Sequence, residues 1–184
     1  MQQGDERAFA DLFARHAPAI YRYAVHMAGP GLADDIVQEV FLALLRQLNR
    51  YEPDRAPLRT YLLGIARRQA LRQLAGPRLD RWPDVDSDAD AEYGMGSATT
   101  AGNPLDALSR SEIVERVRLA VSTLPPGLRE AIVLCDLGEL HYAAAAEVMN
   151  CPIGTVRSRL HRARALLATR LADMRSAALA TNGR

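Results

Sequence analysis

The sequence of 184 residues lacks the features that mark membrane, secreted and disulfide-rich proteins. No apolar run approaches the roughly 18 residues of a membrane-spanning helix, and the first residues are polar and charged. We therefore expect no signal peptide, no membrane insertion and a cytoplasmic protein. The two cysteines, Cys135 and Cys151, form no CxxC pair and no recognised zinc spacing with the histidines, so both are expected to be buried, reduced thiols.

Aromatic residues are also scarce, at 5% of the chain, and no stretch alternates apolar and polar residues as a half-buried strand does. Apolar residues recur instead at helical spacing, and a hydrophobic content of 48% is ample for a core. These observations predict an all-α fold. Lysine is absent, since all 23 basic residues are arginine, but a GC-rich genome explains this as well as a functional constraint does.

The motifs of common enzyme classes are missing as well. The sequence contains no HExxH zinc motif, no phosphate-binding glycine loop and no recognisable pairing of a nucleophile with a base. An enzyme would have to build its site from four scattered histidines or two cysteines. We therefore expect no catalytic residue, no metal site and no cofactor.

The formal net charge of +1 conceals two basic segments and an acidic one. Residues 50–76 contain six arginines against two acidic residues, and residues 152–184 contain seven against one. Residues 77–108 contain two arginines against seven acidic residues. Because clustered basic residues are typical of nucleic-acid-binding surfaces, each half of the chain carries a candidate DNA-contacting segment.

The N-terminal half is predicted to form helices over residues 5–28, 33–48 and 58–74. Gly29-Pro30-Gly31 separates the first two, and Asp34 and Asp35 fall in the first turn of the second, where the helix dipole favours acidic residues. The apolar residues of these two helices are expected to be core: Phe9, Leu12, Phe13, Ile20, Val25, Met27, Ile36, Val37, Val40, Phe41, Leu44, Leu45 and Leu48.

A helix-turn-helix is predicted near the C-terminus. A short helix covers Tyr142 to Met149, Asn150 can adopt the left-handed conformation of a tight turn, and Pro152 suits the start of a second helix. In such a unit the second helix enters the major groove of DNA. Its apolar stripe is expected to face the core: Ile153, Val156, Leu160, Ala163, Leu167 and Leu171.

The opposite face of this second helix carries only small, hydrogen-bonding or cationic groups, which suit a groove bounded by phosphates. Arg159 and Arg164 lie closer to the apolar stripe, where they reach a phosphate or a neighbouring carboxylate more readily than a base. A solvated basic face remains an alternative. The outward positions are Thr155, Arg157, Ser158, His161 and Arg162.

The segments Leu124-Pro125-Pro126, Arg129-Glu130-Ala131 and Cys151 to Leu160 resemble region four of the extracytoplasmic-function (ECF) sigma factors. The resemblance implies that this half of the chain recognises the −35 promoter element. It implies base contacts at the five outward positions, and contacts to the DNA backbone by Arg159 and Arg164.

The run from Asp34 to Leu42 resembles region two of the same family. On a helix, Asp35, Gln38, Glu39 and Leu42 form a second stripe, which taken alone is equally consistent with an ordinary solvated face, since one exposed leucine needs no explanation. The resemblance implies instead that these four residues bind core RNA polymerase, at the clamp helices of its largest subunit.

The turn from Arg50 to Pro57 and the helix after it resemble the part of region two that contacts the −10 element, where a base of the non-template strand is flipped out. Unstacking a base costs a few kcal/mol, which a pocket and phosphate contacts must offset. The residues implied to lie near the −10 DNA are Tyr51, Arg55, Arg59, Tyr61, Arg67 and Arg68.

The resemblance covers most of residues 5–75 and 108–171 and implies two small helical domains. Region two would span residues 1–76 and region four residues 107–184, joined by a flexible acidic linker over residues 77–106. The linker is equally consistent with a simple tether and with a nucleic-acid mimic that threads into the polymerase.

An ECF sigma factor binds core RNA polymerase at the clamp helices and the flap, brings it to −35 and −10 promoter elements, and assists promoter melting. A cognate anti-sigma factor is a further family expectation that no residue here identifies. The rival interpretation is a stand-alone helix-turn-helix regulator. It accounts for residues 140–171 but leaves the stripe from Asp35 to Leu42 and the basic helix after Pro57 without a role.

Overall fold

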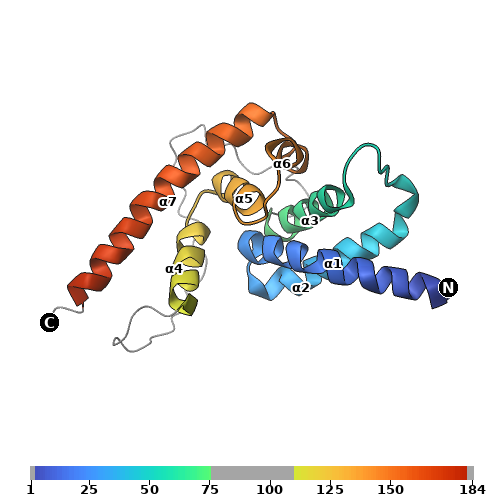
Figure 1. Cartoon of the computed structure of the whole chain (residues 1–184), viewed down its shortest axis with the longest axis horizontal. Helices are drawn as coiled ribbons and strands as arrows, with labels where there is room; N and C mark the ends of the chain where they lie inside the picture. Colours follow the sequence, from blue (N-terminus) through green and yellow to red (C-terminus); the bar gives the residue numbers. More distant parts are fainter. Residues whose placement is uncertain (1–2, 76–109, 182–184) are drawn as a thin grey trace.

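The computed structural model describes residues 3–75 and 110–181, which contain seven α-helices, one short 3-10 helix and no strand (Figure 1). The prediction of an all-α fold is confirmed. The linker predicted over residues 77–106 lies outside the described residues. The helices are α1 (Gln3–Ala28), α2 (Pro30–Arg46), η1 (Leu48–Arg50), α3 (Leu58–Ala75), α4 (Arg110–Ser122), α5 (Pro126–Cys135), α6 (Tyr142–Met149) and α7 (Ile153–Thr181).

The break between α1 and α2 lies where it was predicted, at Gly29. This residue has φ 88° and ψ 163°, in the region that favours glycine, and Pro30 occupies the first turn of α2. The helix therefore starts three residues earlier than predicted. Asp34 and Asp35 consequently lie beyond the first turn, so the predicted stabilisation by the helix dipole was wrong.

Helices α1, α2 and α3 pack against one another around a core of aliphatic and aromatic residues. Five of the predicted residues of α2 are buried, from Ile36 to Leu44, but Leu45 and Leu48 are exposed by 48% and 58%. Leu48 leaves the stripe because α2 ends at Arg46, and η1 follows with a different geometry. Phe13 is also partly exposed, although its ring packs on Phe41 with centroids 4.6 Å apart.

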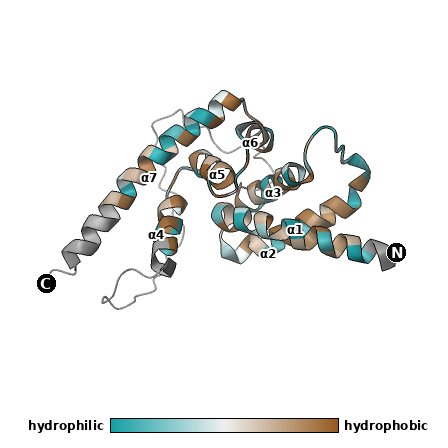
Figure 2. Cartoon of the chain, in the orientation of Figure 1, coloured by the Kyte–Doolittle hydropathy of each residue, from teal (hydrophilic) through white to brown (hydrophobic). Residues whose placement is uncertain are grey.

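Helices α4 to α7 form the second group, in which α5 is the central element. Every residue of α5 from Gly127 to Leu134 is buried, because α1, α4, α6 and α7 all pack against it. Figure 2 shows α5 as a mainly hydrophobic segment, in contrast to the mixed surface of α7. In α7, Val156, Leu160 and Ala163 are buried as predicted, whereas Ile153 is exposed at the first turn.

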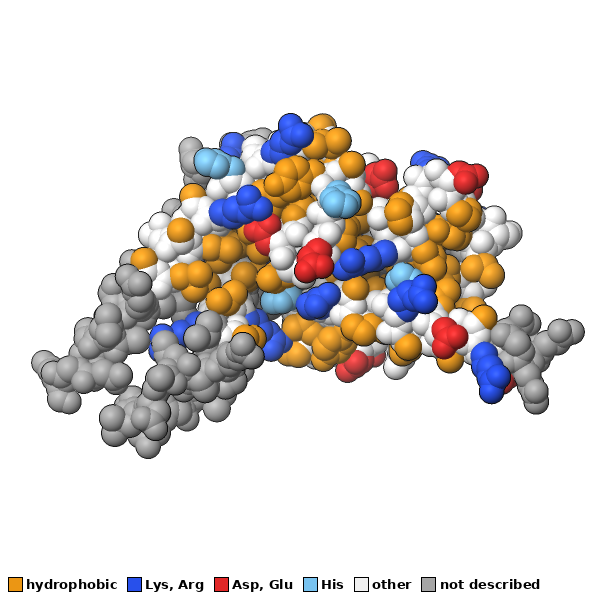
Figure 3. All heavy atoms as spheres, viewed as in Figure 1, with side chains coloured by type: hydrophobic (Ala, Val, Ile, Leu, Met, Phe, Trp, Pro, Cys, Tyr) orange, Lys and Arg blue, Asp and Glu red, His pale blue; other side chains and the backbone are white. Residues whose placement is uncertain are grey.

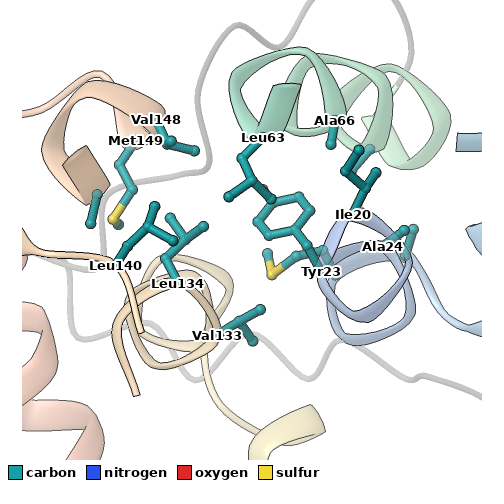
Figure 4. Close-up of a cluster of buried hydrophobic side chains, with 14 of the residues drawn as sticks. Ile20, Tyr23, Ala24, Leu63, Ala66, Val133, Leu134, Leu140, Val148 and Met149 are labelled. Atoms are coloured by element: carbon teal, nitrogen blue, oxygen red, sulfur yellow. The ribbon is translucent and has the colours of Figure 1, made fainter. Parts of the chain in front are cut away.

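The two groups of helices also share one continuous core. Helix α3 packs on α6, and α1 packs on α5 and α4. Figure 4 shows Tyr23 and Leu63 from the first group on the side that faces Val133 and Leu134 from the second. The structure is therefore a closed arrangement of the two groups. Within the described residues, no helix is both long and apolar enough to span a bilayer.

Candidate nucleic-acid interface

The turn between α6 and α7 has the geometry that was predicted for a helix-turn-helix. Asn150 adopts the left-handed conformation, with φ 50° and ψ 52°. The amide of Cys151 donates to the carbonyl of Ala146 at 3.1 Å, which closes the turn, and Pro152 precedes the first residue of α7. This turn places α7 across α5 and α6 with its first turns projecting beyond them (Figure 1).

The outer face of the N-terminal half of α7 brings the five predicted base-contacting residues together. Arg157, Ser158, His161 and Arg162 are exposed and Thr155 is half-buried. The hydroxyl of Ser158 donates to the carbonyl of Thr155 at 3.0 Å and still offers acceptor lone pairs outward. Figure 3 shows cationic and histidine side chains gathered over this end of α7.

Arg159 does not belong to this face, contrary to the prediction that it contacts the DNA backbone. Its side chain is only 8% exposed and lies against the start of α5. A Cβ atom at Gly127 would lie 3.4 Å from both Cζ and Nε of Arg159, so glycine leaves room for the guanidinium. Arg159 lies three residues after Val156 and four before Ala163, both of which are buried, so it lies at the edge of the buried face of α7.

Arg164 is exposed but is held by a carboxylate, which is one of the two partners predicted for it. Its Nε donates to Oδ2 of Asp136 at 3.0 Å and its Nη2 donates to Oδ1 at 2.6 Å. This bidentate bond, together with a hydrogen bond to Tyr142, raises the pKa of Arg164. Arg164 thus ties α7 to the end of α5 and the start of α6.

The predicted −10 residues divide into two sets. Arg55 and Arg68 are exposed, and the rings of Tyr51 and Tyr61 pack with centroids 5.3 Å apart. This aromatic contact joins the turn before α3 to the first turns of α3. Arg55 lies in that turn, and Arg68 lies near the middle of α3, about two turns after Tyr61.

The other two −10 residues, Arg59 and Arg67, point toward the second group of helices. Nη2 of Arg59 donates to the carbonyl of Gly138, in the turn after α5, at 2.6 Å. Nε of Arg67 donates to Oε1 of Glu130 at 2.9 Å, and both of these side chains are buried. In the closed arrangement neither arginine is positioned to contact DNA, which the sequence did not indicate.

The stripe predicted to bind polymerase lies on the side of α2 opposite its core residues. Asp35 and Gln38 are exposed, Glu39 is half-buried and Leu42 is 42% exposed. Leu45, one turn after Leu42, was predicted to be core but extends this exposed apolar surface instead. The four predicted residues are thus brought together on one face.

Sequence reasoning missed the residues that hold the two groups together, above all Tyr23 and Glu130. Tyr23 Oη donates to Oε1 of Glu130 at 2.7 Å, deep in the core. Burial raises the pKa of both groups, while Arg67 opposes the rise. The only sequence signal was an acidic residue amid the apolar residues of α5, which an amphipathic pattern alone does not pair with distant helices.

The stability of the fold is expected to depend on pH through His26, which is partly buried and lies near several arginines. Burial lowers its pKa below 6.5, and the charges of Arg118, Arg129 and Arg22 lower it further. The unfolded chain therefore binds more protons than the folded chain below about pH 6.5, so this contribution to stability is full above that pH and declines as the pH falls. Urea unfolding at about pH 7.5 and about pH 5.5 should show a smaller loss of stability in His26→Gln than in the wild type.

The matched control is His161→Gln, since His161 is an exposed histidine on α7. His161→Gln should keep the wild-type pH dependence. An equal pH dependence in His26→Gln and the wild type would contradict the assignment of this effect to His26.

The comparisons with known proteins agree with these two groups of helices. Residues 12–78 match the family Sigma-70 region 2, and residues 114–167 match the family Sigma-70, region 4. The chain is 34% identical over 166 residues to the ECF RNA polymerase sigma-E factor of Escherichia coli (strain K12), covering 89% of this chain and 86% of that protein. It is 37% identical over 168 residues to the RNA polymerase sigma-H factor of Pseudomonas aeruginosa, with the same coverage.

Two solved structures have the same fold. One is the sigma factor RpoE in complex with the anti-sigma factor NepR from Bartonella quintana, with a TM-score of 0.64 and 24% identity, covering 90% of this chain and 98% of that chain. The other is CnrH in complex with the cytosolic domain of CnrY, with a TM-score of 0.64 and 27% identity, covering 91% and 90%. The chain therefore belongs to the ECF sigma factors of the sigma-70 family, whose members are not enzymes, and it directs RNA polymerase to promoters.

Proposed function

We propose that the outer face of α7 recognises the −35 element in the major groove. The observation that carries this proposal is the joint exposure of Arg157, Ser158, His161 and Arg162 on the second helix of a helix-turn-helix. An α-helix fits the major groove, and arginine offers guanine a bidentate pair of hydrogen bonds. Arg164, which is bonded to Asp136, keeps this helix at a fixed position on α5 and does not recognise a base.

The other two surfaces bind core RNA polymerase and the −10 DNA. The stripe of Asp35, Gln38, Glu39 and Leu42 binds the clamp helices of core RNA polymerase. The surface of Tyr51, Arg55, Tyr61 and Arg68 contacts the non-template strand at −10, where aromatic rings can stack on an unpaired base and arginines can contact phosphates. Arg59 and Arg67 reach this DNA only after the two groups of helices separate.

Region two is assigned to residues 1–76, region four to residues 107–184 and the linker to residues 77–106. Region four also contacts the polymerase flap. The chain is a cytoplasmic protein that supplies no catalytic group, because the polymerase performs the chemistry. An anti-sigma factor is a further proposed partner, since the similar structure of the sigma factor RpoE is a complex with the anti-sigma factor NepR and that of CnrH is a complex with the cytosolic domain of CnrY.

The test is run-off transcription with core RNA polymerase on a library of promoter sequences. The chain should produce transcripts from templates that share one −35 and one −10 sequence, and core polymerase alone should not. A chain that binds duplex DNA but neither binds core polymerase nor supports transcription would instead be the stand-alone helix-turn-helix regulator.

A further inference from the structure

The two regions meet at a carboxylate that has no contact with water. Glu130 of α5 is 0% exposed and accepts hydrogen bonds from Tyr23 of α1, at 2.7 Å, and from Arg67 of α3, at 2.9 Å. Both donors belong to region two, and the acceptor belongs to region four. We refer to Tyr23, Arg67 and Glu130 as the Glu130 cluster.

Apolar contacts and a second polar contact surround the Glu130 cluster. Leu63 of α3 and Leu134 of α5 point toward each other beside the ring of Tyr23 (Figure 4). Nη2 of Arg59 donates to the carbonyl of Gly138, where a Cβ atom would lie 2.7 Å from the carbonyl oxygen of Leu134. The bond from Arg59 joins the backbone of the turn after α5 to region two.

This closed arrangement cannot be the one that binds a promoter. The −35 and −10 elements lie about 25 base pairs apart, which is about 85 Å at 3.4 Å per base pair. Side chains of regions two and four are instead in direct contact through the Glu130 cluster. In addition, Arg59 and Arg67, two of the residues proposed to contact the −10 DNA, have protein acceptors in place of phosphates.

We propose that the Glu130 cluster is an intramolecular latch that holds the free sigma factor closed, with the Glu130 carboxylate taking the place of a DNA phosphate on Arg67. On opening, Arg67 exchanges one anionic oxygen acceptor for another. This inference rests on the proposed function of α3 in contacting the −10 DNA. It concerns the regulation of that surface within a single chain.

The energetics of the cluster suit a reversible contact. Burying a charged pair costs desolvation free energy that largely offsets the attraction between the charges, so such a pair contributes specificity more than net stability. When the regions separate, water hydrates Glu130 and Arg67 again. The closed state is therefore specific in geometry and can still be opened by a partner that binds only the open state.

The test compares two single-atom changes in the full chain. Tyr23→Phe removes the hydroxyl that donates to Glu130 and keeps the packing of the ring. Tyr21→Phe is the matched control, because Tyr21 lies two residues earlier in α1 and is exposed. A hydrogen bond to a charged group is strong enough that its loss should shift the closed-to-open equilibrium by roughly tenfold or more.

Small-angle X-ray scattering of the free chain measures this shift as an increase in the radius of gyration, and circular dichroism verifies that helicity is intact. Tyr23→Phe should be expanded relative to the wild type and to Tyr21→Phe. If Tyr23→Phe loses helicity, Arg59→Ala serves as the second variant, since it removes the bond to Gly138 and should also expand the chain. The latch is contradicted if the wild type is already extended, or if the folded variants scatter as it does.

Binding to core RNA polymerase gives the functional readout. Tyr23→Phe should bind up to roughly tenfold more tightly than the wild type, because a larger fraction of the free chain is open. Expansion without tighter binding would overturn the regulatory role of the latch. Failure of the wild type and of every variant to bind polymerase would instead overturn the proposed function, while the scattering result would still decide whether the latch exists.

Discussion

Replacing Glu39 and Leu42 together by arginine is expected to abolish binding to core RNA polymerase. Both side chains lie on the stripe of α2 that is proposed to bind polymerase, and Leu42 is the apolar residue of that stripe. Interface residues of this kind cost about 2 kcal/mol or more each when changed, so the double variant should lose roughly 1,000-fold in affinity. Surface substitutions usually change stability by only about 0.5 kcal/mol, so the fold should persist.

The control for this experiment is Leu74→Arg, because Leu74 of α3 is exposed by the same 42% as Leu42 but lies off the stripe. It should leave polymerase binding within about twofold of the wild type. Pull-down with core polymerase and circular dichroism are measured on the same samples. If the double variant is folded and binds as the wild type does, the stripe is an ordinary solvated face and the polymerase contact lies elsewhere.

The helix-turn-helix could be predicted from the sequence because its determinants are local. Asn150 tolerates the left-handed conformation that the turn requires, and Pro152 stops α6 from continuing and suits the start of α7. The apolar stripe through Val156 and Leu160 then fixes which face of α7 is buried. Once that face is fixed, the outward positions follow from helical geometry alone.

Residues at the edge of a stripe were harder to place, because their orientation depends on the neighbouring helix. Arg159 has a side chain that suits a DNA contact, but the absence of a side chain at Gly127 lets it pack against α5. Leu45 and Leu48 are apolar like core residues, but α2 ends at Arg46 and both side chains are exposed. Periodicity gives the centre of a buried face and not its limits.

The closed arrangement could not be predicted from the sequence at all. Glu130 lies 107 positions after Tyr23 and 63 positions after Arg67, and no local pattern pairs it with either residue. Arg59 and Arg67 belong to a basic helix that suits DNA equally well, so their internal bonds become visible only when the two regions are placed side by side. Each of these arginines can bond either a protein acceptor or a DNA phosphate, and the proposed latch depends on this exchange.

The second large effect is expected at Arg162, on the outer face of α7. Arg162→Ala should relax the preference for one base pair of the −35 element, because a bidentate arginine pair contributes about 1–3 kcal/mol of discrimination against the wrong base. This corresponds to a loss of roughly 5- to 150-fold in the ratio of matched to mismatched affinity. Arg164→Ala is the natural comparison, since Arg164 lies on the same helix but is bonded to Asp136.

The measurement is a titration of the sigma factor bound to core polymerase on matched and single-mismatch duplexes at several salt concentrations. Arg164→Ala should weaken binding to all duplexes alike, because α7 loses its tie to α5. Its salt dependence should remain that of the wild type, since no phosphate contact is lost. If Arg162→Ala instead loses affinity equally on every duplex and lowers the salt slope by about one, Arg162 contacts a phosphate and recognises no base.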